Sequence, residues 1–163
     1  MAIRNIVKKG DSVLEKHSRP VTEFNDRLHI LLDDMTETLI DSGGVGLAAP
    51  QVGVLRRVVV VIETNVPEED KEYVIELINP EIVEQDGEQT GAEGCLSFPG
   101  KYGIVTRPNH VKVRAQDRYG NFFEVEGEAL TARCFCHEID HLDGVLFPQR
   151  AERMLTPEEV NAE

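Results

Sequence analysis

The sequence is poor in basic residues and in cysteine, and it contains no long apolar run. Its 17 Lys and Arg stand against 30 Asp and Glu, and the net charge of −13 argues against docking on phosphate backbones, which needs clustered cations. Three cysteines are few and odd in number, which favours reduced thiols or metal ligands over a disulfide framework. No stretch approaches the roughly 20 apolar residues of a membrane span, and the start MAIRNIVKKG lacks the apolar core of a signal peptide. We therefore expect a cytoplasmic protein that binds neither nucleic acid nor membranes.

In its other proportions, the sequence has the composition of an ordinary globular protein. Apolar residues make up 40% of the 163 residues and charged residues 29%. This length is enough to bury one sizeable core, so residues 1–163 are expected to form a single domain. An acidic run from Glu68 to Glu72 is typical of a solvated surface loop.

Hydrophobic periodicity predicts an amphipathic helix near the N-terminus, from Thr22 to Asp41, with Thr22 or Asn25 as its cap. A glycine-rich turn, residues 42–53, follows it and lets backbone approach a neighbour closely. The apolar residues that recur at helical spacing are Phe24, Leu28, Leu31, Leu32, Met35 and Leu39.

Strands are predicted in the middle of the chain, at 58–62, at 74–82 and at 111–115, where β-branched residues accumulate. The last should pair with 122–125 through a turn at 117–121. A second helix is expected from near Gly127 to His141, closed at Asp143 and Gly144, and Thr156 should begin a short third one. Strands followed by a helix, without regular alternation, favour an α+β fold of mainly antiparallel strands packed around that helix.

The segment CHEIDHLDG carries the clearest chemical signal. His137 and His141 are four residues apart, so on a helix both project from one face and can bind a single cation. Glu138 beside them could take a proton from water that a metal has acidified. The plain alternative is a surface helix in which these residues repeat by chance. The apolar neighbours of the two histidines indicate burial, and burial without partners would be costly.

An open tetrahedral site needs one more protein ligand. Glu152, Glu158 and Glu159 are available downstream, but they lie in a tail expected to be exposed. Cys134 is too far along the helix axis from the expected metal position, and Cys136 points about 100° away from His137 around the helix. Both are better explained as small buried hydrophobes. Cys95 remains, in the loop EGCLSFPG, which its glycines and proline predict to be exposed and sharply turned. We take it as the third ligand, against the alternative of a free buried thiol.

Three stretches resemble, in order, the signature motifs of the peptide deformylase family. They are GVGLAAPQ at 44–51, EGCLS at 93–97 and HEIDHLDG at 137–144, and the resemblance covers the whole chain. It implies a hydrolase that removes the N-formyl group from the initiator methionine of new polypeptides and releases formate. The family usually has Gln before the first histidine, where this chain has Cys136. The tail after Gly144 is short, so we expect it to lack the long basic C-terminal helix that some relatives use on the ribosome.

The resemblance also assigns roles to residues. Cys95, His137 and His141 would bind one divalent metal ion, Fe²⁺ by preference, with Ni²⁺, Co²⁺ or Zn²⁺ able to substitute. Glu138 would act as base and then as acid, while Gln51 and the backbone NH of Leu96 would form the oxyanion hole. The partners implied are N-formyl-Met nascent peptides and, transiently, the ribosome. For the methionine pocket we select Gly46, Val45, Leu130 and Cys134, which could equally be core residues.

Two rival functions remain open at this point. One is a general zinc peptidase that uses the same helix with a longer substrate groove, and the other is a non-enzymatic metal-binding module closed by four protein ligands. Glu93 and Asp140 lie near the ligands in sequence, and we expect plain salt bridges from both in preference to a role in orienting a ligand.

Overall fold

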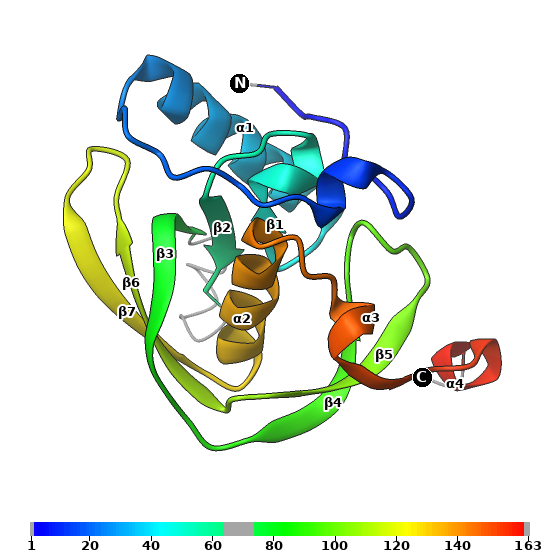
Figure 1. Ribbon diagram of the computed structural model, residues 1–163. Helices are drawn as coiled ribbons and strands as arrows, with labels where there is room; N and C mark the ends of the chain where they lie inside the picture. Colours follow the sequence, from blue (N-terminus) through cyan, green and yellow to red (C-terminus); the bar gives the residue numbers. More distant parts are fainter. Residues whose placement is uncertain (1, 64–73, 162–163) are drawn as a thin grey trace.

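The structure is a computed structural model that describes residues 2–63 and 74–161, and these residues form two antiparallel sheets around a central helix (Figure 1). This arrangement confirms the predicted α+β class. The acidic run predicted as a loop at 68–72 lies outside the described residues. In the described ranges, no helix has the length and apolar character needed to cross a membrane.

The larger sheet has five strands in the order β1-β2-β3-β6-β7, and the smaller has three in the order β4-β5-β8. The first group comprises β1 Gly46–Ala48, β2 Val58–Ile62, β3 Val74–Asp86, β6 His110–Gln116 and β7 Phe122–Glu128. The second comprises β4 Gln89–Gly94, β5 Tyr102–Arg107 and β8 Ala151–Met154. Sequence patterning predicted β2, β3, β6 and β7, and it missed β1 and the whole smaller sheet.

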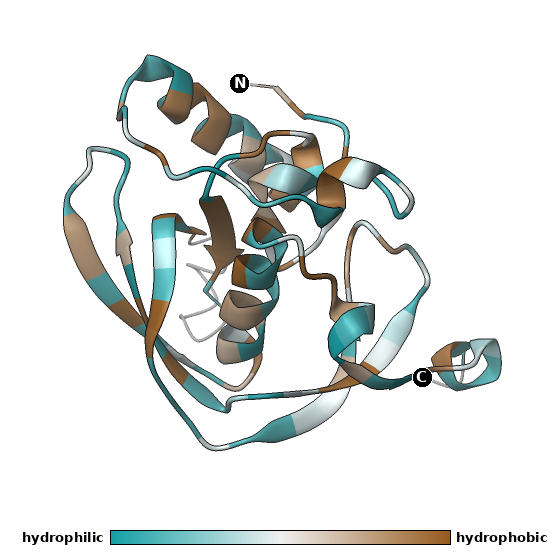
Figure 2. Ribbon diagram, in the orientation of Figure 1, coloured by the Kyte–Doolittle hydropathy of each residue, from teal (hydrophilic) through white to brown (hydrophobic). Residues whose placement is uncertain are grey.

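Strand β2 lies in the middle of the core and is hydrophobic along its whole length (Figure 2). Because side chains alternate along a strand, its valines face two different layers. Val58 and Val60 pack in a cluster with helix α1 (Asp26–Ser42), whereas Val59 and Val61 pack in a cluster with helix α2 (Leu130–Leu142). The two helices therefore cover opposite faces of the larger sheet.

Helix α1 begins four residues later than its hydrophobic pattern suggested. Asn25 is the N-cap, and its side chain accepts a hydrogen bond from the Leu28 N–H at 3.2 Å. Of the two caps proposed, Asn25 is therefore confirmed and Thr22 is wrong. The helix ends at Gly43, whose φ of 73° is the left-handed conformation that glycine adopts without strain.

Helix α2 also begins later than predicted, because Gly127 belongs to β7 and not to the helix. The chain reverses at Ala129, which has φ 54° and ψ −121°, and the helix starts at the next residue. The predicted C-terminal end of the helix is confirmed, since Asp143 is the C-cap and Gly144 has the left-handed φ of 74°. The predicted turn between β6 and β7 is confirmed by a hydrogen bond from the Asp117 N–H to the Asn121 carbonyl at 2.9 Å.

Short elements complete the described chain: η1 Ser12–Glu15, η2 Ala49–Val52, α3 Phe147–Arg150 and α4 Pro157–Asn161. Helix α3 packs beside the smaller sheet, where Phe98, Val105 and Phe147 form a third apolar cluster. Helix α2 lies between the two sheets and is buried along most of its length (Figure 1). Polar side chains of α2 that point toward the smaller sheet therefore lie in the protein interior.

Candidate metal centre

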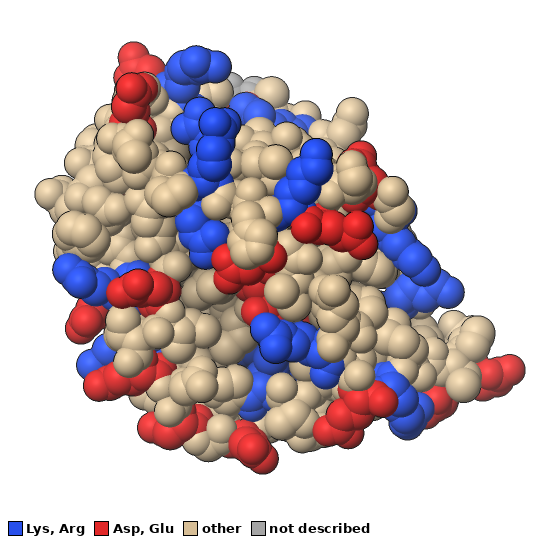
Figure 3. All heavy atoms as spheres, in the orientation of Figure 1, with Lys and Arg blue, Asp and Glu red and all other residues tan. Residues whose placement is uncertain are grey.

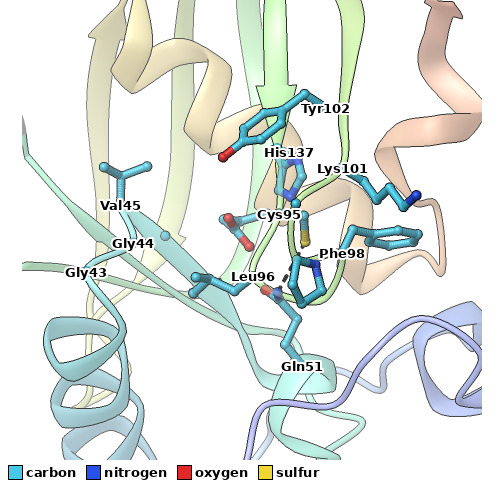
Figure 4. A pocket seen from close by; sticks show the side chains of 15 residues that line it. Gly43, Gly44, Val45, Gln51, Cys95, Leu96, Phe98, Lys101, Tyr102 and His137 are labelled. Atoms are coloured by element: carbon cyan, nitrogen blue, oxygen red, sulfur yellow. Dashed lines mark hydrogen bonds between the residues drawn. The ribbon is translucent and has the colours of Figure 1, made fainter. Parts of the chain in front are cut away.

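A cavity of about 440 Å³ opens where α2 meets the ends of both sheets. Figure 4 shows the chain from Gly43 to Val45 on one side of it and Phe98 and Lys101 on the other. The glycine-rich turn, the segment after β4 and helix α2 each contribute to the lining. The three sequence motifs, far apart in the chain, therefore meet around one space.

Three ligand-type atoms converge at the bottom of this cavity. The sulfur of Cys95 and one ring nitrogen from each of His137 and His141 all lie within 4.8 Å of one another. The Cys95 Sγ is 3.4 Å from the His141 Nε2, which is 3.2 Å from the His137 Nε2. The predicted ligand set is thus brought together, and in the described residues neither Cys134 nor Cys136 belongs to the group.

These separations fit one cation. Metal–sulfur bonds of about 2.3 Å and metal–nitrogen bonds of about 2.1 Å at tetrahedral angles place sulfur and nitrogen about 3.6 Å apart and two nitrogens about 3.4 Å apart. The observed 3.4 Å and 3.2 Å are close to these values. Three donors leave the fourth tetrahedral position to a non-protein ligand, as in catalytic sites.

The segment that carries Cys95 is less exposed than its glycines and proline suggested. Cys95 is half-buried, and Ser97 and Phe98 are buried. The Phe98 N–H closes a turn onto the Cys95 carbonyl at 2.9 Å, and the Lys9 N–H of the N-terminal segment donates to the Ser97 carbonyl at 2.8 Å. The prediction of a sharp turn is confirmed. That of exposure holds for Pro99 and Gly100 and is wrong for the residues before them, where the N-terminal segment covers the turn.

Glu93 does more than form the plain salt bridge that we expected. Its Oε2 lies 2.6 Å from the His137 Nδ1, while its two oxygens also bind Arg107 and Arg133 at 2.7–2.8 Å. A carboxylate at Nδ1 fixes the ring so that Nε2 faces the other ligands. The expectation for Glu93 was therefore incomplete. Asp140 forms the salt bridges expected of it, to Arg107 at 2.7 Å and to an arginine of α3.

The electrostatic surroundings favour positive charge on His137. Burial alone would lower the pKa of this ring, but Glu138, Cys95 and Glu93 outweigh burial and raise its pKa well above the ordinary value. Burial also tends to raise the pKa of Glu93, yet hydrogen bonds from His137 and Arg107 bring it down to about 2. Burial and the neighbouring His137 lower the pKa of His141, which stays neutral and can offer a lone pair.

Glu138 lies beside the ligand group in a buried position, where burial raises its pKa to about 7. Its Oε1 is buried and has no hydrogen-bond partner among the described residues. A Cβ added at Gly46 would lie 2.7 Å from the Glu138 Oε2, so only glycine leaves room for this carboxylate. An uncommitted carboxylate with a pKa near neutrality has the properties of a general base.

Gln51 and Leu96 each contribute a hydrogen-bond donor to the part of the site around Cys95. The Gln51 Nε2 donates to the Cys95 Sγ at 3.4 Å (Figure 4) and to the Ser97 Oγ at 3.2 Å. The Ala48 N–H donates to the Gln51 Oε1 at 3.0 Å, which orients the amide. The Leu96 N–H, inside the turn that begins at Cys95, donates to no other group in the described part of the chain.

The four residues selected for the methionine pocket are placed differently. Gly46 and Val45 line the cavity, with Val45 37% exposed. Cys134 lies behind Gly46, with its Sγ 2.8 Å from the position that a Gly46 Cβ would take, and Leu130 is exposed one helical turn earlier. Neither Cys134 nor Leu130 is part of the lining.

Sequence reasoning missed several residues of the site. Phe98, Lys101 and Tyr102 line the cavity, and Arg107 and Arg133 hold Glu93. They come from β5, from the turn before it and from α2. Because β5 was not predicted, its register opposite β4 could not be known, and no local signal marks these residues.

A family model described as "Polypeptide deformylase" matches residues 3–156. Peptide deformylase of Lachnoclostridium phytofermentans is 61% identical over 150 residues, which cover 92% of this chain and 90% of the relative. That of Caldanaerobacter subterraneus is 55% identical over 160 residues, covering 98% of this chain and 96% of the relative.

Solved structures agree with these relatives. A peptide deformylase from Legionella pneumophila superposes with a TM-score of 0.85 at 44% identity and covers 99% of this chain and 90% of its own. The structure from Thermotoga maritima has a TM-score of 0.85 at 39% identity and covers 93% and 99%.

Proposed function

This chain belongs to the polypeptide deformylase family, and from this premise we propose which of its residues carry out the hydrolysis and with which metal. The chain is a hydrolase that removes the N-formyl group from the initiator methionine of newly synthesised polypeptides. The observation that carries the assignment of residues is the convergence of Cys95, His137 and His141 within 4.8 Å.

In the proposed site, these three residues hold one divalent cation. Ferrous iron is our first choice, and a ligand set of one thiolate and two imidazoles is also compatible with nickel, cobalt and zinc. The bound cation supplies polarisation of the formyl carbonyl and acidification of a water molecule. Glu93 accepts the Nδ1 proton of His137 at 2.6 Å and so leaves the Nε2 lone pair free for the cation.

Glu138 then moves the protons. It takes one proton from the attacking water as the water oxygen bonds to the formyl carbon, and it returns a proton to the amide nitrogen as the C–N bond breaks. The products are formate and a free amino terminus. Burial raises the pKa of Glu138 to about 7, so in the absence of the cation it exchanges protons near neutral pH, which suits both roles.

The developing negative charge on the formyl oxygen lies between two fixed donors, the Gln51 Nε2 and the Leu96 N–H. Because the Ala48 N–H holds the Gln51 amide by its oxygen, the Nε2 keeps its position, and one of its two N–H groups turns from the Cys95 Sγ or the Ser97 Oγ to the formyl oxygen when charge appears. The methionine side chain packs against Gly46 and Val45, with Cys134 behind that surface, and Leu130 takes no part because it lies outside the cavity lining.

The test measures formate release from formyl-Met peptides together with cleavage of internal peptide bonds. We expect formate release alone. Protein purified without oxygen should contain about one metal ion per chain. The Glu138→Gln variant should lose at least about 100-fold in kcat while it keeps the metal. Cleavage of internal bonds, or full activity in this variant, would refute the proposal.

The wider setting follows from the substrate. We propose that residues 1–163 act as one catalytic domain in the cytoplasm, where formylated nascent chains emerge, and that contact with the ribosome is transient. Affinity for formylated nascent peptides rests on the cavity described above.

A further inference from the structure

Charge is distributed unevenly along this acidic chain. Residues 1–57 hold eight of the 17 Lys and Arg and eight of the 30 Asp and Glu, so this part is formally neutral and residues 58–163 carry the whole net charge of −13. The net charge alone led us to expect no contact with phosphate backbones. Its distribution leads to a different conclusion for one face of the molecule.

Arginines from three separate segments meet on that face. Residues 19 and 56 are joined by a parallel β-bridge, and Arg4, Arg27 and Arg56 line one cavity of about 220 Å³. Arg57 continues the group, because its N–H donates to the Arg19 carbonyl at 3.0 Å. In Figure 3, Lys and Arg side chains form a band across the upper part of the molecule, over the region of α1 and the segment before it. We call these five residues the arginine face.

Three members of the arginine face are uncommitted. Arg19, Arg27 and Arg56 are exposed, and in the described residues none of them forms an ion pair. Arg4 and Arg57 are bound to Asp34 and Asp143 at 2.9 Å and 3.0 Å.

Besides Asp34 and Asp143, which bind Arg4 and Arg57, two acidic residues lie in the same segments as the arginine face. Glu23 also lines the cavity, where it accepts a hydrogen bond from Asn25 at 3.3 Å, and Asp26 begins α1. Neither pairs with an arginine in the part of the chain that the structure describes. Unpaired guanidinium groups held side by side repel one another, and a phosphate anion relieves that repulsion through paired N–H donors.

We propose that the arginine face docks on the phosphate backbone of RNA. This inference rests on the proposed function, because a deformylase meets its substrate while the chain is being made, at a surface rich in RNA. A band of several guanidinium groups fits a row of phosphates better than it fits one small anion. The acidic remainder of the chain limits the contact to this face and keeps it weak, which suits an enzyme that must leave each nascent chain.

The experiment measures binding of fluorescently labelled double-stranded RNA to the full chain over a range of salt concentrations. The test variant is Arg27→Gln with Arg56→Gln. The matched control is Arg114→Gln with Arg153→Gln, which removes the same charge from two exposed arginines on β6 and β8. We expect the test variant to bind about 10-fold more weakly at low salt and the slope of log K against log salt to fall by about 2. The control should keep the wild-type slope.

A conservative variant, Arg27→Lys with Arg56→Lys, keeps the charges and should keep most of the slope. Equal losses in the test and control variants would overturn the proposal, because they would show that net charge alone acts. Absence of RNA binding by the wild type would also overturn it, as would preferential binding to phosphatidylglycerol vesicles. Formate release from a formyl-Met peptide should be unchanged in all variants. If the wild type released no formate, the proposed function would be refuted, but the RNA-binding measurements could still be interpreted.

Discussion

Replacing Gly46 by Ala tests whether the position of the Glu138 carboxylate sets the rate of hydrolysis. The added Cβ would lie 2.7 Å from the Glu138 Oε2 and 2.8 Å from the Cys134 Sγ, whereas ordinary contact begins at 3.4 Å. The carboxylate must therefore move by about 0.7 Å, since the buried Cys134 blocks retreat in one direction. None of the three predicted ligand atoms is among the nearest neighbours of this Cβ.

A displacement of this size in a catalytic group lowers the rate of the reaction strongly. Misplacement by about 1 Å can cost about 100-fold, so we expect kcat to fall by about 10- to 100-fold, or about 1.4–2.7 kcal/mol in the activation barrier. The assay is formate release from a formyl-Met peptide, with metal content measured on the same sample. Metal content should be unchanged.

Gly91→Ala is the matched control. The nearest atom to its added Cβ is the Arg133 Nη2 at 3.8 Å, so the methyl group fits without displacement. This variant should keep the wild-type kcat. Wild-type kcat in Gly46→Ala would refute the reasoning, and loss of metal in parallel with loss of activity would show that the ligands, and not Glu138, had moved.

Three further predictions concern stability and thiol reactivity. Glu93→Gln should destabilise the metal-free protein by about 3 kcal/mol at pH 7. The pKa of Glu93 in the folded protein is about 2, below the ordinary 4.5, so its contribution to stability is present above pH 4.5 and is lost as the pH falls toward 2. A difference in unfolding free energy between variant and wild type that did not change with pH would contradict this prediction. Ala129→Gly should raise the unfolding free energy by about 0.5–1 kcal/mol, because glycine adopts φ 54° and ψ −121° without strain. The control Ala92→Gly, at an exposed strand position, should lower the unfolding free energy. If urea titration showed a lower unfolding free energy in both variants, strain at Ala129 would be excluded. Burial raises the pKa of Cys136 to about 11 and that of Cys134 well above normal, so iodoacetamide at pH 8 should modify neither before unfolding, and rapid labelling in mass spectra would oppose this.

The donor set of the site could be predicted from the sequence because most of it follows from local geometry. His137, Glu138 and His141 share one helix, and a spacing of four places both rings on one face whatever the rest of the chain does. Cys95 was reached by elimination, and the structure brings its sulfur to those rings. Helix α1 was predicted because its buried stripe repeats at the helical period.

The remainder depends on contacts between distant parts of the chain. Strand β4 has the sequence QTGAEG, which carries no β-branched alternation, and it is a strand only because β5 pairs with it. The partners of Glu93 follow from that pairing and from the approach of α2. Sequence analysis, which treats each segment separately, therefore predicted only a salt bridge for Glu93 and missed its contact with His137. Likewise, the start of α2 is decided by the backbone of Ala129, a residue type that gives no turn signal.

The ligands belong to different layers of the fold. Cys95 follows the last strand residue of β4 in the smaller sheet, whereas both histidines belong to the helix that packs on the larger sheet. A cation shared by these three side chains is a cross-link that exists only when both sheets are in place, so its binding free energy adds to the work of pulling the sheets apart. Metal supply should therefore govern how long the folded chain lasts as well as whether it turns over substrate.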